Sequence, residues 1–144
     1  MKLAILLVCL AGGVCILPPN SEIDFQNGDL HLARDQAIMD GKWVFVEVYA
    51  SWCIACRLMD ETTFRSPLVA EVMSSHFIPV RLDIDDIEGK IFAAEHNVSI
   101  LPALLVIDGK GKKISQVNEA LSTNEMVSVL DQCAEKKAQL ATER

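Results

Sequence analysis

Two apolar runs near the middle of the chain have the length and composition of buried β-strands. The first, Trp43–Tyr49, is rich in valine and aromatic residues and contains a single carboxylate, Glu47. The second, Ala103–Ile107, is apolar throughout. A sheet that contains such continuous apolar strands is covered by helices on both faces. Three further strands are predicted over residues 23–25, 77–84 and 113–117.

Segments with apolar residues at helical spacing lie between these strands. The first, Leu30–Met39, can be capped by Asp29 or Asn27, and Gly41 ends it. The other predicted helices cover residues 53–60, 68–73 and 87–96, and a last helix begins at Thr123 or Asn124. The charged tail from Lys136 is expected to fray. The predicted order is β-α-β-α-β-α-β-β-α, an α/β fold with a central mixed sheet between helices.

The length and charge of the chain narrow the classes of function. A chain of 144 residues is long enough for one domain with a substantial core. It carries 13 basic and 20 acidic residues, a net charge of −7, with no basic stripe. We therefore do not expect a nucleic acid as a partner.

The N-terminal segment has the pattern of a secretory signal peptide. Met1 and Lys2 precede an apolar run, residues 3–17, and then the polar turn at residues 18–21. The run is shorter than the roughly 20 apolar residues of a membrane span. We predict a signal peptide over residues 1–20 and one domain over residues 21–144. A lipid anchor on Cys15 or an uncleaved anchor is the alternative.

Cys53 and Cys56 form a C-x-x-C pair at the predicted junction of a strand and a helix. Near a βαβ pattern, this arrangement is typical of a redox-active dithiol. At a helix N-terminus, unpaired N–H groups and the helix dipole favour an anion, so the pKa of Cys53 is expected to be low. Cys53 then attacks a substrate disulfide, and Cys56 resolves the mixed disulfide.

A zinc half-site or a structural disulfide is the alternative interpretation of this pair. A zinc site needs two more ligands. Neither the remaining cysteines nor the histidines form a second paired ligand motif. We therefore expect no metal and no cofactor.

Residues 51–56, Ser-Trp-Cys-Ile-Ala-Cys, resemble the W-C-x-x-C motif of the thioredoxin superfamily. Leu101-Pro102 resembles the cis-proline of that family, and residues 80–85 resemble its central strand. The resemblance covers roughly residues 22–135. It implies the thioredoxin fold, a cis bond before Pro102, and a substrate groove beside the disulfide formed by Trp52, Leu101 and Pro102.

The sequence is most similar to the branch that includes the C-terminal domain of the bacterial transmembrane reductase DsbD. There too a Thr-Phe and a Ser/Pro-initiated helix follow the motif, here in residues 63–67. The absence of Gly-Pro between the cysteines argues against a general cytosolic thioredoxin. The resemblance implies an exported, periplasmic thiol-disulfide oxidoreductase, and the Cys-Ile-Ala-Cys motif resembles reductases more than strong oxidants.

The expected partners are protein or small-molecule disulfides and an upstream donor, such as a membrane reductase. A membrane-anchored or secreted protein is the alternative location. A non-catalytic thioredoxin-like binding or chaperone module is the alternative function. The presence of both Cys53 and Cys56 disfavours such a module.

Glu47 lies six residues before Cys53, where thioredoxins resemble one another in having a buried acid beneath the resolving cysteine. Burial raises the pKa of a carboxyl, which can then exchange a proton with Cys56 at neutral pH. Arg81, on the next central strand, is the candidate partner of Glu47. The alternative is a strand carboxylate that faces solvent.

Overall fold

A five-stranded mixed sheet forms the centre of the molecule, whose computed structural model describes residues 22–143. The strands are β1 (Gln26–Asn27), β2 (Trp43–Tyr49), β3 (Phe77–Asp83), β4 (Ala103–Ile107) and β5 (Lys113–Val117). The helices are α1 (Leu30–Met39), α2 (Ile54–Glu61), the 3₁₀ helix η1 (Thr63–Arg65), α3 (Pro67–His76), α4 (Ile87–His96) and α5 (Thr123–Thr142). The predicted signal peptide lies outside the described residues.

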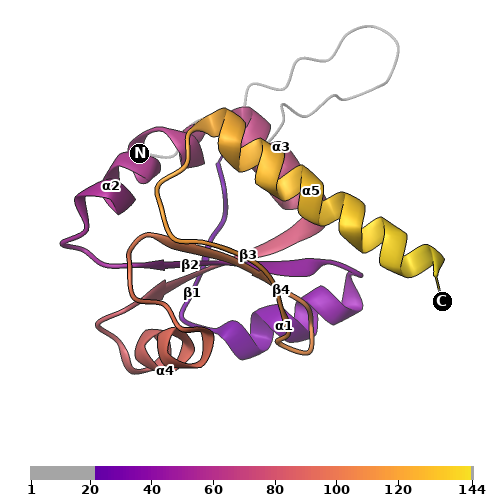
Figure 1. Ribbon diagram of the computed structural model, residues 1–144, viewed down its shortest axis with the longest axis horizontal. Helices are drawn as coiled ribbons and strands as arrows, with labels where there is room; N and C mark the ends of the chain where they lie inside the picture. Colours follow the sequence, from indigo (N-terminus) through magenta and orange to yellow (C-terminus); the bar gives the residue numbers. More distant parts are fainter. Residues whose placement is uncertain (1–21, 144) are drawn as a thin grey trace, which may run out of the picture.

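The strand order β1-β3-β2-β4-β5 places β2 at the centre of the sheet. β2 is parallel to β3 and antiparallel to β4. Within this register Glu47 is paired with Arg81 on β3 and with Leu104 on β4. The C-terminal ends of β2 and β3 lie at the same edge, and there the chain turns from β2 into α2, at the left of Figure 1.

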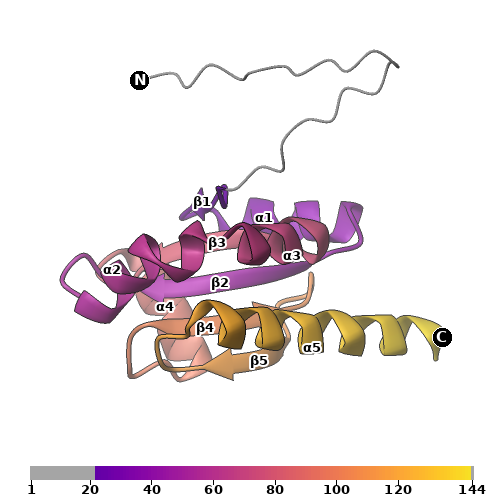
Figure 2. The same ribbon diagram turned by 90° about the horizontal axis from the view of Figure 1, so that it is seen from above.

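Helices cover both faces of the sheet, as the sequence predicts. In Figure 1, α2, α3 and α5 lie above the sheet, and α1 and α4 lie below it. Figure 2 shows the same elements from above, with α5 running along β4 and β5. Alternate residues of β2 divide between the two cores: Phe45 packs with Met59 and Met126, and Val46 packs with the core beneath the sheet. Glu47 therefore projects towards the face that α2 covers.

The ends of several elements follow from local sequence chemistry. The carboxylate of Asp29 accepts a hydrogen bond from the backbone N–H of Leu32, so Asp29 caps α1 as expected. Gly41, with φ +62°, makes the turn that separates α1 from β2. Pro67 begins α3.

Two predictions for the ends of the chain were wrong in detail. The first strand is Gln26–Asn27 instead of residues 23–25, because Ile23 and Phe25 pack against the core while the polar residues after them pair with β3. The start of α5 is confirmed at Thr123, one of the two predicted positions, and its N-cap Ser122 forms a capping box with Glu125. The expected frayed tail is helical to Thr142, because Ala, Lys, Gln and Leu favour continuation of an established helix.

Two further observations concern the helices of the described residues. The segment between β2 and β3 contains two α-helices, at the places predicted over residues 53–60 and 68–73, with η1 between them; the predicted order counts the two as one α. Within residues 22–143, no helix combines the length and the apolar character that crossing a membrane requires.

Candidate active site

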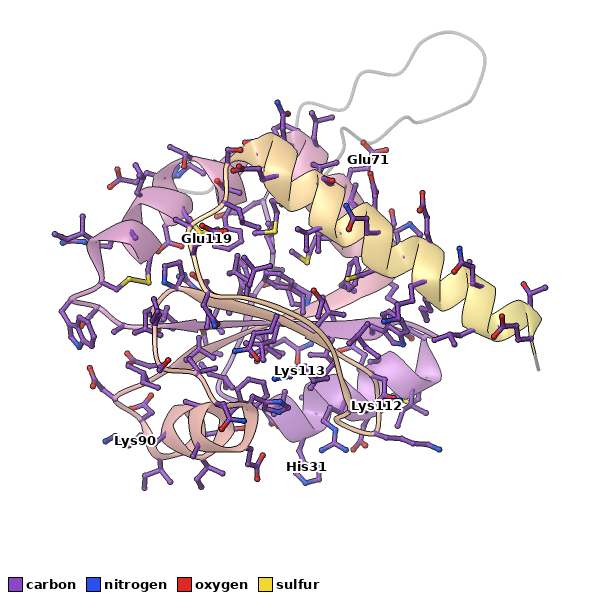
Figure 3. All side chains as sticks on the ribbon, in the orientation of Figure 1. His31, Glu71, Lys90, Lys112, Lys113 and Glu119 are labelled. Atoms are coloured by element: carbon purple, nitrogen blue, oxygen red, sulfur yellow. A yellow bond between two sulfur atoms is a disulfide. The ribbon has the colours of Figure 1, made fainter. Side chains whose placement is uncertain are left out.

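Cys53 and Cys56 form a disulfide at the N-terminus of α2. Figure 3 shows it as the yellow bond between two sulfur atoms beside the start of this helix. Cys53 is the N-cap residue, and its Sγ accepts a hydrogen bond from the backbone N–H of Cys56 at 3.1 Å. The same N–H is positioned to stabilise a Cys53 thiolate when the disulfide is reduced. Cys53 is 6% exposed and Cys56 is 1% exposed, so a substrate reaches Cys53 first.

The surface around the disulfide is apolar and comes from separate loops. Trp52 is 64% exposed, and its Nε1–H donates a hydrogen bond to Oδ2 of Asp85, 2.9 Å away on the loop between β3 and α4. Leu101 packs against the small cluster that contains both cysteines. The bond between Leu101 and Pro102 is cis, as the resemblance implies, and Pro102 is buried. Exposed Ile54 and Ile100 adjoin these residues in the sequence.

Glu47 is fully buried, which excludes the alternative of a solvent-facing carboxylate. Its Oε2 lies 2.7 Å from Nε of Arg81, so the predicted partner is confirmed as an ion pair. Its Oε1 has no hydrogen-bond partner within residues 22–143. Burial raises the pKa of Glu47 from 4.5 to about 7, against the lowering effect of Arg81, and the negative charge of Asp60 adds to the rise. The group can therefore bind or release a proton near neutral pH.

Asp60 is a member of this charged cluster that the sequence reasoning missed. It lies on α2, and its Oδ1 is 2.8 Å from Nη2 of Arg81. Although burial opposes the charge of Arg81, the two carboxylates raise the pKa of its guanidinium. The position of Asp60, four residues after Cys56, is the sequence signal that could have identified it, because residues i and i+4 share a helix face.

His31 and Cys133 do not belong to the cluster of residues around the disulfide. His31 on α1 is exposed and projects away from the fold in Figure 3. Cys133 is free and buried on α5. Among residues 22–143, the structure contains no group of three or more His, Cys, Asp or Glu that could hold a metal ion. The two cysteines are instead bonded to each other.

Comparison with known proteins agrees with this geometry. Residues 24–109 match a family model described as thioredoxin-like. Over 100 residues the chain is 30% identical to the thiol:disulfide interchange protein DsbD of Pseudomonas fluorescens, covering 67% of this chain. Over 85 residues, 57% of this chain, it is 29% identical to DsbD of Escherichia coli K12. The matched part is only 17% of the first relative and 15% of the second.

Solved structures show the same fold at lower sequence identity. The oxidised C-terminal domain of Neisseria meningitidis DsbD is 22% identical with a TM-score of 0.62, covering 72% of this chain and 91% of that one. A thioredoxin from Thermus thermophilus is 18% identical with a TM-score of 0.73, covering 83% and 94% of the two chains. These similarities confirm the predicted arrangement of a central mixed sheet and flanking helices.

Proposed function

The chain belongs to the thioredoxin-like family, and we propose that it is a thiol:disulfide oxidoreductase in which Cys53 and Cys56 are the exchanging pair. The observation that carries the proposal is the disulfide between these residues at the N-terminus of α2, with Cys53 as the N-cap. A helix N-terminus stabilises a thiolate, and the thiolate is the nucleophile of disulfide exchange.

Reduction of a substrate disulfide proceeds in two exchanges. The Cys53 thiolate attacks one substrate sulfur, a new S–S bond forms, and the other substrate sulfur leaves as a thiolate that takes a proton. Cys56 then gives its proton to the Glu47 carboxylate and attacks Sγ of Cys53, so that the bond to the substrate breaks and the second substrate sulfur leaves as a thiolate that takes a proton from water. The protein ends as the Cys53–Cys56 disulfide, and a donor dithiol returns two electrons to it.

The surface around Cys53 supports a role in binding an extended substrate. Trp52, which precedes Cys53, offers an exposed aromatic side chain, and Leu101 packs beside the cysteines from another loop. Pro102 follows Leu101 at the start of β4. We assign Trp52, Leu101 and Pro102 to the substrate groove.

The redox direction and the location are finer parts of the same proposal. The Cys-Ile-Ala-Cys motif supports a reductase, because strong oxidants tend to have a histidine between the cysteines. The signal-like pattern of residues 1–20 supports export to the periplasm, with residues 21–144 as the working domain. The proposed partners are disulfides of proteins or small molecules and an upstream donor such as a membrane reductase.

The equilibrium between the protein and glutathione buffers tests both activity and direction. We expect a two-electron transition that Cys133→Ser retains and that Cys53→Ser abolishes. A reductase has a potential nearer the value of about −270 mV found for thioredoxin than the value of about −120 mV found for strong oxidants. Absence of exchange in the wild-type protein would contradict the oxidoreductase and favour a binding module.

A further inference from the structure

The guanidinium of Arg81 lies between two carboxylates that differ in exposure. Its Nε is 2.7 Å from Oε2 of Glu47, whose side chain is fully buried. Its Nη2 is 2.8 Å from Oδ1 of Asp60, whose side chain is 36% exposed. One positive charge therefore faces two negative charges when both carboxylates are ionised, and one negative charge is left without a partner.

Other contacts fix the place of this guanidinium. Its central carbon lies 4.3 Å from the centre of the Tyr49 ring and 5.2 Å from that of Phe25. Asp60 comes from α2 and Glu47 from β2, so the arginine connects the helix that carries Cys56 to the central strand. The two acids compete for a cation that has little freedom to move towards either one.

We propose that Asp60 is a positioning residue for Glu47. By holding Arg81 between α2 and β2, Asp60 weakens the attraction of the guanidinium for the buried carboxylate and so sets the pH range in which Glu47 takes up the proton of Cys56. This inference rests on the proposed function for its catalytic consequence. The electrostatic part can be measured without any exchange reaction.

The proton transfer that Asp60 controls is the second exchange of the proposed reaction. The thiol of Cys56 loses its proton, and the Glu47 carboxylate becomes the neutral acid. With Glu47 neutral, the charge of Arg81 is balanced by Asp60 alone, so the protonated state leaves no unpaired negative charge in the cluster. With Asp60 neutralised, Arg81 would instead pair fully with ionised Glu47, and the proton would be held less tightly.

Charged and titratable groups around Glu47 come from three elements. They are Tyr49 on β2, Arg81 on β3 and Asp60 on α2. The pKa of Tyr49 is raised above 10.0 by burial, so this hydroxyl stays neutral near pH 7. On β4, the residue opposite Glu47 is the apolar Leu104. The influence of Asp60 can therefore be separated from that of its neighbours by single substitutions.

The test is a titration of the Glu47 carboxyl carbon by ¹³C NMR in the oxidised protein, with Glu47→Gln used to identify the resonance. We expect Asp60→Asn to lower the titration midpoint by on the order of one pH unit. Asp60→Glu, which keeps the charge, should restore the midpoint. Arg81→Gln should move it in the opposite direction, to higher pH. Glu61→Gln removes the same charge from the next position of α2, where the side chain is exposed, and should leave the midpoint unchanged.

An unchanged midpoint in Asp60→Asn would overturn the proposal, and so would an equal shift in Glu61→Gln, which would indicate an effect of net charge alone. If Asp60→Asn does not fold, Arg81→Gln still tests the proposal. A titration midpoint of Glu47 that is unchanged or lower in Arg81→Gln would contradict the proposal that Glu47 and Asp60 share the charge of Arg81. The pH profile of mixed-disulfide resolution should shift to lower pH in Asp60→Asn. Loss of exchange in the wild-type protein would contradict the proposed function, whereas the NMR titration would still decide the role of Asp60.

Discussion

The indole of Trp52 donates a hydrogen bond from Nε1–H to Oδ2 of Asp85, with 2.9 Å between the two atoms. Trp52 immediately precedes Cys53, and Asp85 lies on the loop between β3 and α4. The bond therefore connects the two loops that follow neighbouring parallel strands. It holds an aromatic ring in a defined place beside the disulfide although 64% of the residue's surface is exposed.

Replacing Asp85 by alanine should free the Trp52 ring without unfolding the protein. An exposed hydrogen bond contributes about 1 kcal/mol or less, so the free energy of unfolding should change little. The fluorescence of Trp52 should become more accessible to acrylamide, while buried Trp43 stays protected. Quenching measured in a Trp43→Phe background reports Trp52 alone, and an Asp86→Ala variant on the same loop is the matched control. Equal quenching in all variants would show that the bond does not order the ring.

Cys53 should be the cysteine that reacts first. The reduced protein, treated with limiting iodoacetamide near neutral pH and mapped by mass spectrometry, should carry the label on Cys53, because its thiolate is stabilised at the start of α2 and Cys56 is 1% exposed. Cys56→Ser should accumulate mixed disulfides with substrates, whereas Cys53→Ser should not. Preferential labelling of Cys56 would reverse the assigned roles.

Local sequence chemistry was sufficient to predict several elements to the residue. The bounds of α1, β2, α4, β4 and β5 agree with the structure, because capping residues, turn glycines and changes of hydrophobic period mark them. Arg81 could be named as the partner of Glu47 because it is the basic residue on the next central strand, whereas the register that brings the two together comes from the structure. The cis bond before Pro102 was predicted from the resemblance to the thioredoxin superfamily, and not from the pattern of apolar and polar residues.

The spacing of Asp60 from Cys56 places both residues on one face of α2, but the ion pair of Asp60 with Arg81 depends on tertiary structure. Its contact with Arg81 requires α2 to pack over the sheet at one particular rotation, which the sequence pattern alone does not fix. The first strand shows the same limit, since Phe25 carries the apolar signal while Gln26 and Asn27 make the pairing. The apolar residue that indicates a strand can therefore be a neighbour of the residues whose backbone makes the pairing.

Gly89 on α4 should not tolerate a side chain. A Cβ atom at this position would lie 1.9 Å from the backbone oxygen of Asp83 at the end of β3, so the helix would have to move away from the sheet. We expect Gly89→Ala to lower the free energy of unfolding by about 3 kcal/mol, as overpacking against backbone does. Urea denaturation measures the change, and Glu95→Ala on the exposed side of α4 is the control. A loss below about 1 kcal/mol would mean that the helix adjusts easily.

Burial of Glu47 should make the stability of the oxidised protein fall as the pH rises. The pKa of Glu47 is about 7 in the folded protein against 4.5 for an ordinary glutamate, so the folded state binds a proton that the unfolded state has already lost. The contribution of Glu47 to stability is complete below about pH 4.5 and is lost between that value and about pH 7. The loss amounts to about 3 kcal/mol and stays constant at higher pH.

Glu47→Gln should remove this part of the pH dependence, because the amide is neutral throughout and keeps the size of the acid. Relative to the wild-type protein, the variant should gain free energy of unfolding between about pH 4.5 and pH 7, as measured by urea denaturation with the disulfide intact. Glu61→Gln, an exposed acid on α2, should follow the wild-type curve. Parallel curves for Glu47→Gln and the wild-type protein across this range would show that Glu47 is ionised in the folded state at low pH, held charged by Arg81, and would remove it as a proton acceptor near neutrality.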